Sequence, residues 1–419
     1  MIIEFSITNF RSIHQKQVFS MEANAARSKA DNVFEQPISN GEKVSLTKAA
    51  VIYGANASGK SNLVRGLQAL QTLVTNFIPD IGEPIKSYNP FLFDKKSAKA
   101  DTSFELIFIK HKEKYRYEIT FNQEEIIKET LLSYPKKQAR TLFTRPFEKN
   151  EKDPNLHIGR LGKELGNKKY KIHKKLPLLA LFGSAQEYHT VISIVYSYFK
   201  ELVIFVSPHF FVNPRLPQLE NELEKNKLER LIRACDTQIQ GLRIVEMAKA
   251  DSESALSRTN QDLLAKHTVF DEGKMSGLYE LPFNEESLGT NRLLGLGHFI
   301  LKALEKGNLI VFDELDSSLH PYVARFLVKL FFNTISNPNN AQLIFTTHEP
   351  SLLDKDLLRA DQIWFTEKTP QGATEFFSAQ DFDGVREDMP FDKWYMEGKF
   401  GAIPHISEIE YIFGNGKTH

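Results

Sequence analysis

The chain has 419 residues, and its 53 Lys and Arg residues balance 53 Asp and Glu residues. This balance excludes a global field that would draw the whole protein to nucleic acid or to a membrane, so any such attraction must be local. A hydrophobic share of 41% and 32 Phe residues predict a folded protein with one large or two ordinary domains. Cys235 is the single cysteine, which excludes an intramolecular disulfide, and we expect a cytoplasmic protein in which this thiol is a small core residue. No stretch offers the roughly 20 clean apolar residues of a membrane helix, so we expect no membrane partner.

Apolar patterns predict several elements in the first 133 residues. Alternating apolar residues predict an opening strand pair over residues 1–20, and residues 48–53 read as a short buried strand. Apolar residues spaced by three and four positions between Leu63 and Phe77 predict a helix with one buried face. Residues 104–132 read as an antiparallel meander.

The later segments differ in character. Residues 134–176 hold thirteen Lys and Arg against four Asp and Glu. Residues 178–206 predict a helix followed by a strand, and residues 218–236 predict a charged helix. Residues 250–275 are polar, and we expect a loop or weak order there. Residues 349–419 predict a helix and a short strand pair before an aromatic-rich tail.

The run from Gly54 to Ser61 has the pattern G-x-x-x-x-G-K-S, which we call the phosphate loop. Its glycines let backbone N–H groups curl around a di- or triphosphate, while Lys60 can reach the β- and γ-phosphates and the Ser61 hydroxyl can ligate Mg²⁺. The helix behind the loop directs its positive N-terminus at the anion. The pattern therefore predicts nucleotide binding by Asn56, Ala57, Ser58, Gly59, Lys60, Ser61 and Asn62.

Two acids follow a second buried strand, which is predicted over residues 309–312. Asp313 is placed to support the Mg²⁺ ion, and Glu314 is placed to polarise a water for attack on the γ-phosphate. The alternative is a strand end that turns into solvent. The phosphate loop in the same chain favours the first interpretation.

Three further motifs surround these acids: residues 316–321 directly after them, a buried strand over residues 342–348 that ends in His348, and Ser287-Leu288-Gly289-Thr290 before an amphipathic helix. Ser287 or Gly289 would cap that helix and direct its N-terminus outward. We expect this second positive helix end to cover the γ-phosphate of another subunit. A core histidine at a strand end is the alternative for His348.

This set of motifs resembles the ABC-type ATPase heads, including the SMC, DNA-repair and OLD-like ATPases. Residues 7–12 are also similar to the opening "NFRS" strand of those proteins. The sequence most resembles the abortive-infection ATPases of bacterial anti-phage systems, of the RloA/AbiLi kind. That resemblance rests on residues 54–62, 89–91, 313–321, 361–365 and 398–404.

The resemblance implies an α/β fold: an ABC-ATPase head with a P-loop core sheet, an antiparallel β lobe and a helical insertion lobe, without a long coiled coil. It implies an N-terminal half of the head over residues 1–133, a basic and helical insertion over 134–280, a C-terminal half over 281–355 and an extension over 356–419.

The resemblance also implies roles for single residues. Arg11 would approach the nucleotide from the first strand, His348 would sense or stabilise the γ-phosphate, and Ser287 and Gly289 would act across a head-to-tail dimer. ABC heads carry a glutamine that links Mg²⁺ to the attacking water. Gln186 is our candidate, and a surface glutamine on a helix is its alternative.

The function expected from the resemblance is an ATPase that binds ATP and Mg²⁺, assembles as a homodimer or higher oligomer, and controls a separately encoded toxin or TOPRIM-type nuclease in anti-phage defence. A repair ATPase that binds nucleic acid through residues 134–176 is the alternative, because aromatic residues lie among the charges: Tyr134, Phe143, Phe147 and Tyr170. A third hypothesis is an OLD-like nuclease that uses Asp381 and Asp383.

Overall fold

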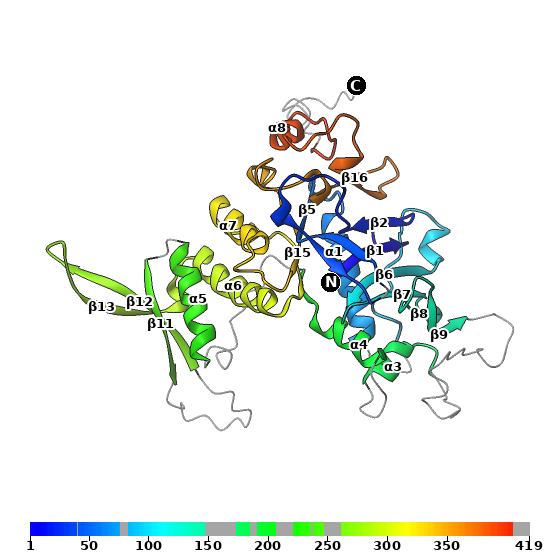
Figure 1. Cartoon of the computed structure of the whole chain (residues 1–419), viewed down its shortest axis with the longest axis horizontal. Coiled ribbons are helices and arrows are strands. Elements are labelled where there is room, and N and C mark those ends of the chain that lie inside the picture. Colours follow the sequence, from blue (N-terminus) through cyan, green and yellow to red (C-terminus); the bar gives the residue numbers. More distant parts are fainter. Residues whose placement is uncertain are drawn as a thin grey trace, which may run out of the picture.

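The computed structural model describes residues 1–39, 41–75, 83–146, 173–184, 191–206, 221–235, 238–246 and 261–404. These residues form two six-stranded sheets, a three-stranded sheet and a two-stranded sheet, with helices packed between and around them (Figure 1). The described part thus confirms the predicted α/β class with a core sheet and an antiparallel β lobe, and it contains no coiled coil.

The core sheet carries the phosphate loop. Its strands lie in the order β10 (Val203–Phe205), β14 (Leu309–Phe312), β15 (Gln342–Thr346), β5 (Ala49–Gly54), β16 (Ile363–Lys368) and β17 (Thr374–Ser378). All neighbours are parallel except β16 and β17. The strands β5, β14 and β15 are continuous buried runs, as expected for a parallel sheet covered on both faces. Their carboxyl ends therefore meet at one edge, where the segments after β5, β14 and β15 come together.

The β lobe is an antiparallel sheet. Its strands lie in the order β2 (Gln17–Ser20), β1 (Ile2–Thr8), β6 (Thr102–Lys110), β7 (Glu113–Phe121), β8 (Ile126–Ser133) and β9 (Arg140–Pro146). Buried and less buried residues alternate along β7, which is typical of a sheet with one covered face. The opening strand pair and the meander were both predicted correctly. A small ladder of β3 (Val33–Pro37) and β4 (Lys43–Thr47) lies beside them.

Helices cover both faces of the core sheet. On one face α1 (Lys60–Thr75), α3 (Leu178–Ser184) and α4 (Val191–Glu201) share a hydrophobic core with the β lobe. On the other face lie α6 (Leu288–Lys306) and α7 (Pro321–Phe332), with α5 (Glu222–Ala234) packed on α6 and α8 (Phe391–Met396) near the C-terminal end. Period-two alternation in β5 sends Ile52 to the first core and Tyr53 to the second. Within the described ranges, no helix has the length and apolarity to cross a bilayer.

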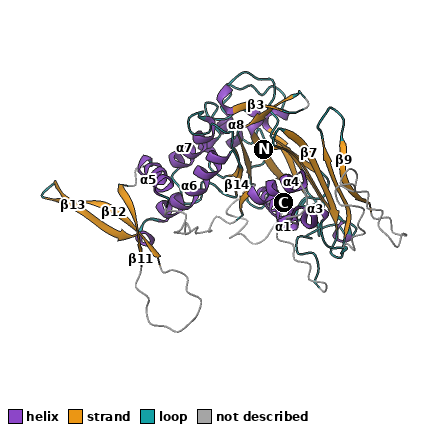
Figure 2. Ribbon diagram, turned by 60° about the horizontal axis from the view of Figure 1, so that its bottom comes forward, coloured by secondary structure: helices purple, strands orange, loops and turns teal. Residues whose placement is uncertain are grey.

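The third sheet projects from the body of the molecule (Figures 1 and 2). It consists of β11 (Ile239–Glu246), β12 (Gln261–Asp271) and β13 (Lys274–Pro282). The expectation of a loop over residues 250–275 is therefore wrong from Gln261 onward, while residues 247–260 lie outside the described residues. The pattern was misleading because much of β12 and β13 is exposed on both faces, so polar residues fill positions that a half-buried strand would give to apolar ones.

Part of the basic segment 134–176 belongs to the interior. Arg145 is buried in β9, where its Nη2 donates to Glu129 Oε2 (3.4 Å) and to the Leu176 carbonyl (3.1 Å). Lys175 is buried and donates to the Glu83 carbonyl (2.5 Å), and Phe143 is a core residue. These three side chains cannot contact nucleic acid, which corrects the prediction at these positions. Phe147, Tyr170 and the remainder of 147–172 lie outside the described residues, and the division into four domains stays a prediction.

Candidate nucleotide-binding site

The phosphate loop lies between β5 and α1, where the chain turns from a buried strand into a helix. Gly54 and Gly59 have φ angles of 156° and 113°, and a Cβ at Gly59 would overlap the side chain of Thr374. Glycine is therefore required at position 59 by conformation and by space. Lys60 starts α1, and its Nζ donates to the carbonyls of Gly54 (2.7 Å) and Ala55 (3.1 Å). The ammonium group thus lies over the loop into which the phosphates would fit.

Ser61 and Asp313 meet across the sheet edge, although 252 positions separate them in the sequence. The Ser61 hydroxyl donates to Asp313 Oδ1 (3.0 Å), and the buried Thr346 hydroxyl donates to the same oxygen (2.7 Å). The contact forms because β14 and β5 both pair with β15, so their carboxyl ends lie in one row. A hydroxyl and a carboxylate at this spacing are hard oxygen donors of the kind that Mg²⁺ prefers.

The electrostatics of Lys60 reflect this arrangement. Burial lowers the pKa of Lys60 to about 8, and Asp313, Glu314 and Asp316 oppose that shift. Three acids therefore act on the lysine that would hold the phosphates. The negative charge of a triphosphate bound here would also favour the protonated, charged form of Lys60.

Glu314 follows Asp313 in a left-handed backbone conformation, with φ of 55°. Its N–H donates to the Thr346 hydroxyl (2.8 Å), and its carbonyl accepts from Arg292 Nη2 (2.8 Å). A non-glycine residue at positive φ is strained, so these bonds hold the main chain in a conformation that it would otherwise leave. The carboxylate is partly exposed at the end of the sheet.

The segment Ser287–Thr290, which we call the signature segment, begins α6. Ser287 is the N-cap: its hydroxyl accepts from the Thr290 N–H (3.1 Å), as predicted. Ser287 and Leu288 are exposed, whereas a Cβ at Gly289 would lie 2.8 Å from the Ser318 carbonyl oxygen of the same chain. The segment therefore lies against the residues that follow Glu314 and presents its capped helix end to solvent.

His348 lies two residues after β15 and is exposed. Partial burial of the ring lowers the pKa of His348, and the nearby charge of Lys60 lowers it further. The acids Glu314, Asp316 and Asp313 oppose this shift. Asp316 has one buried oxygen, Oδ1, without a hydrogen-bond partner in the described part of the chain. The phosphate loop, both acids, Asp316 and His348 therefore share one site.

Arg11 lies at a tight turn after β1, with φ of 53° and an exposed side chain. Burial and the nearby Arg65 of α1 lower the pKa of Arg11. The next residue, Ser12, accepts from Asn62 Nδ2 (2.5 Å) and its hydroxyl shares a hydrogen bond with Thr374 Oγ1 (2.7 Å). The turn thus lies against the start of α1, and the expected approach of Arg11 to the nucleotide stays a prediction.

Sequence reasoning did not assign roles to Thr346, Arg292 or Thr374. Thr346 was visible at the end of its strand, and Arg292 stands two residues after the signature segment, so local signals existed for both. Thr374 donates to the Ser58 carbonyl (2.7 Å) from the start of β17, and no local pattern marks it. Gln186 lies outside the described residues, so its assignment stays a prediction.

Residues 49–354, which contain this site, match a family model with the description "AAA domain, putative AbiEii toxin, Type IV TA system". The chain belongs to this family. The match spans the phosphate loop, the acids and His348, which confirms the resemblance to abortive-infection ATPases at the level of the family. The chain matches none of the curated proteins.

Solved structures similar to this family member include two SMC heads. One is the SMC head domain from Thermotoga maritima, with 12% identity, a TM-score of 0.41, and coverage of 90% of this chain and 98% of that one. Another is the Smc head domain with an extended coiled coil bound to the C-terminal domain of ScpA, from Pyrococcus furiosus, with 12% identity, a TM-score of 0.38, and coverage of 90% and 96%.

Proposed function

We propose that this AAA-domain protein binds ATP with Mg²⁺ and hydrolyses it to ADP and phosphate. The observation that carries the proposal is the contact of Ser61 with Asp313, beside Lys60 and Glu314. Lys60 and the loop N–H groups would hold the phosphates, together with residues 56–59 and Asn62. Ser61 and Asp313 would hold the Mg²⁺ ion, which would neutralise charge on the β- and γ-phosphates.

Glu314 is the proposed catalytic base. Hydrogen bonds with Thr346 and Arg292 fix the main chain of Glu314. Its carboxylate therefore needs little reorganisation to receive a proton from the attacking water. His348 is proposed to contact the γ-phosphate. Its lowered pKa favours the neutral ring at neutral pH, which can donate one hydrogen bond without adding a full charge.

We further propose that two copies join head to tail around two ATP molecules. Ser287 and Leu288 are exposed at the start of α6, and among the described residues the Ser287 hydroxyl bonds to Thr290 and not to the phosphate loop of its own chain. The exposed helix end, with the N–H groups that Ser287 does not cap, suits an anion presented by another subunit. Ser287 and Gly289 would then complete the partner's pocket, so nucleotide occupancy becomes an assembly signal.

The proposed output is control of a separately encoded effector, a toxin or a TOPRIM-type nuclease, in anti-phage defence. The family description, which names a toxin of a toxin–antitoxin system, supports a two-component arrangement. The OLD-like nuclease hypothesis gains no support, because Asp381 Oδ2 accepts from the Ser378 N–H (2.8 Å) and so caps a short turn.

The deciding experiment compares the parent with Lys60→Ala and Glu314→Gln in size-exclusion chromatography and phosphate-release assays with ATP and Mg²⁺. Lys60→Ala should lose ATP binding and stay in the nucleotide-free assembly state. Glu314→Gln should bind ATP, hydrolyse it at least a hundredfold more slowly, and accumulate the ATP-joined assembly. Hydrolysis by Glu314→Gln at the parent rate would refute the catalytic assignment.

A further inference from the structure

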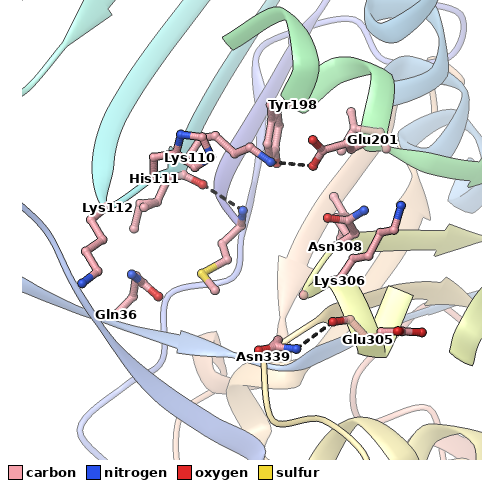
Figure 3. A pocket seen from close by; sticks show the side chains of 15 residues that line it. Gln36, Lys110, His111, Lys112, Tyr198, Glu201, Glu305, Lys306, Asn308 and Asn339 are labelled. Carbon is pink, nitrogen blue, oxygen red and sulfur yellow. Dashed lines mark hydrogen bonds and ion pairs between the residues drawn. The ribbon is translucent and has the colours of Figure 1, made fainter. Parts of the chain in front are cut away.

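A cavity lies at the edge of the core sheet opposite the phosphate loop (Figure 3). Its volume is about 400 Å³, and it borders Asn308 and Leu309 at the amino end of β14. Its walls come from the β6–β7 turn of the β lobe, the end of α4 and the end of α6. The cavity therefore lies where the β lobe, α4 and the signature helix meet, remote from Lys60 and Glu314.

Basic residues form the turn that enters this cavity. His111 and Lys112 connect β6 to β7, and both adopt positive φ angles, 50° and 63°. A two-residue hairpin turn of this kind favours glycine or asparagine, because a Cβ is strained in the left-handed region. The chain instead places two basic side chains there, at the cavity.

The positive charges of the cavity exceed the negative ones. Lys110 Nζ pairs with Glu201 (2.5 Å), so these two charges offset each other, as Figure 3 shows. Glu305 approaches Lys227 (3.9 Å), which does not line the cavity. Within the ranges that the structure describes, no ion pair is found for His111, Lys112 or Lys306. Two lysines and a histidine thus have no acidic partner there.

Tyr198 adds a buried polar group to the wall. Only 4% of the residue is exposed, and its ring stacks on Phe108 with the centroids 4.2 Å apart. Its hydroxyl has no hydrogen-bond partner among the described residues. A buried hydroxyl without a partner is unfavourable, so a small shift of this wall that opened the hydroxyl to a bound acceptor would satisfy it.

We propose that this cavity binds a small phosphate-containing anion. Its volume lies in the range of sites for small molecules, roughly 300–1,000 Å³. Lys112 and Lys306 would bind the phosphate oxygens, and ammonium groups form strong charge-assisted hydrogen bonds with phosphate. The hydroxyl of Tyr198 would donate to the same ligand.

The position of the cavity would let a bound ligand influence the nucleotide site through helix α6. Helix α6 runs from the signature segment to Lys306, and its 19 residues span roughly 28 Å. One rigid element thus has its first turn at the proposed dimer surface and its last residue at the cavity. Ligand binding at Lys306 would bias the position of Ser287, which makes the cavity an effector site.

The test uses the full chain with Lys60→Ala, which removes phosphate binding at the phosphate loop and keeps the result independent of ATP hydrolysis. Isothermal titration with sodium pyrophosphate, without Mg²⁺ and at low salt, should give one site per chain. Adding Lys112→Gln and Lys306→Gln should weaken binding at least tenfold. Adding Lys266→Gln and Lys274→Gln instead, a half-buried and an exposed lysine of the projecting sheet, should change the affinity less than twofold.

Tyr198→Phe, in the same background, separates ligand binding from folding. Because the hydroxyl has no partner, its removal should leave the melting temperature of the free protein unchanged or raise it, while pyrophosphate affinity falls several-fold. Absence of binding, or equal weakening in both lysine pairs, would show non-specific charge attraction only and overturn the proposal. Citrate binding as tight as pyrophosphate binding would overturn the assignment to phosphates.

Discussion

Arg292 Nη2 donates to the main-chain carbonyl of Glu314 across 2.8 Å. Arg292 lies on α6, two residues after the signature segment, so this bond joins the helix that would cover a neighbour's nucleotide to the proposed base of its own subunit. Burial lowers the pKa of Arg292, while Asp316 and Glu314 oppose the shift, so the guanidinium stays charged in this acidic site. In the proposed dimer, this bond would connect the two composite pockets within each chain.

Replacing Arg292 should affect catalysis more than ATP binding. In Arg292→Gln, loss of a charged hydrogen bond of about 1.5–3 kcal/mol should lower kcat by about 10- to 100-fold, because Glu314 is no longer held at positive φ. The Kd for ATP should change less than threefold. Arg325→Gln is a matched control, because Arg325 pairs with Asp354 (2.6 Å) away from the site and should keep kcat near the parent value.

The two readouts separate this prediction from the proposed function. Steady-state phosphate release gives kcat, and fluorescence titration with a labelled ATP gives Kd. If the parent hydrolyses ATP and Glu314→Gln does not, but Arg292→Gln retains the parent kcat, only the positioning role of Arg292 fails.

Thr346 should be required for both stability and hydrolysis. Thr346→Val keeps the side-chain shape but leaves Asp313 Oδ1 and the Glu314 N–H without their common hydroxyl partner. We expect a loss of about 1–3 kcal/mol in the free energy of unfolding and strongly reduced phosphate release. Urea denaturation and the ATPase assay measure both effects. Thr347→Val is the neighbouring control: within the described residues its hydroxyl accepts only from the Glu349 N–H (2.9 Å), and activity should persist.

ATP affinity should depend on pH through Lys60. Its pKa of about 8 means that the nucleotide-free site loses this positive charge above pH 8, whereas the bound triphosphate requires the charged form. Affinity should therefore be constant below pH 8 and fall by up to about tenfold per unit above it, with proton uptake on binding. Calorimetry in buffers of different ionisation enthalpy measures that uptake. A constant affinity from pH 7 to pH 9 would contradict the prediction.

Composite pockets predict complementation between two inactive variants. Lys60→Ala disables its own phosphate loop, and Ser287→Asp keeps the N-cap of α6 but repels a partner's phosphate. Each variant alone should be inactive. An equal mixture should recover about a quarter of the parent rate, because half of the dimers are mixed and each holds one intact pocket. A mixture without phosphate release would argue against pockets shared between subunits.

Much of the site could be predicted because its chemistry is local. The glycines, Lys60 and Ser61 are neighbours in the chain, and a strand before and a helix after them fix their geometry. Asp313 and Glu314 follow a buried apolar strand, and the carboxyl ends of parallel strands share one edge, so the contact of Asp313 with Ser61 was foreseeable. The N-cap at Ser287 depends only on its own first turn.

The remainder depended on contacts between distant segments. The β12–β13 hairpin was missed because a sheet exposed on both faces lacks an apolar period.

By itself, the sequence determined the phosphate loop, the acids, the α/β class and the family, since each follows from short-range pattern. Only the tertiary structure decided that Thr346 bridges Asp313 and Glu314, that Arg292 ties α6 to the proposed base, and that Thr374 supports the loop. Those side chains act through one or two hydrogen bonds each across packed elements, and sheet register and helix packing decide the partners of such bonds, which no local pattern encodes.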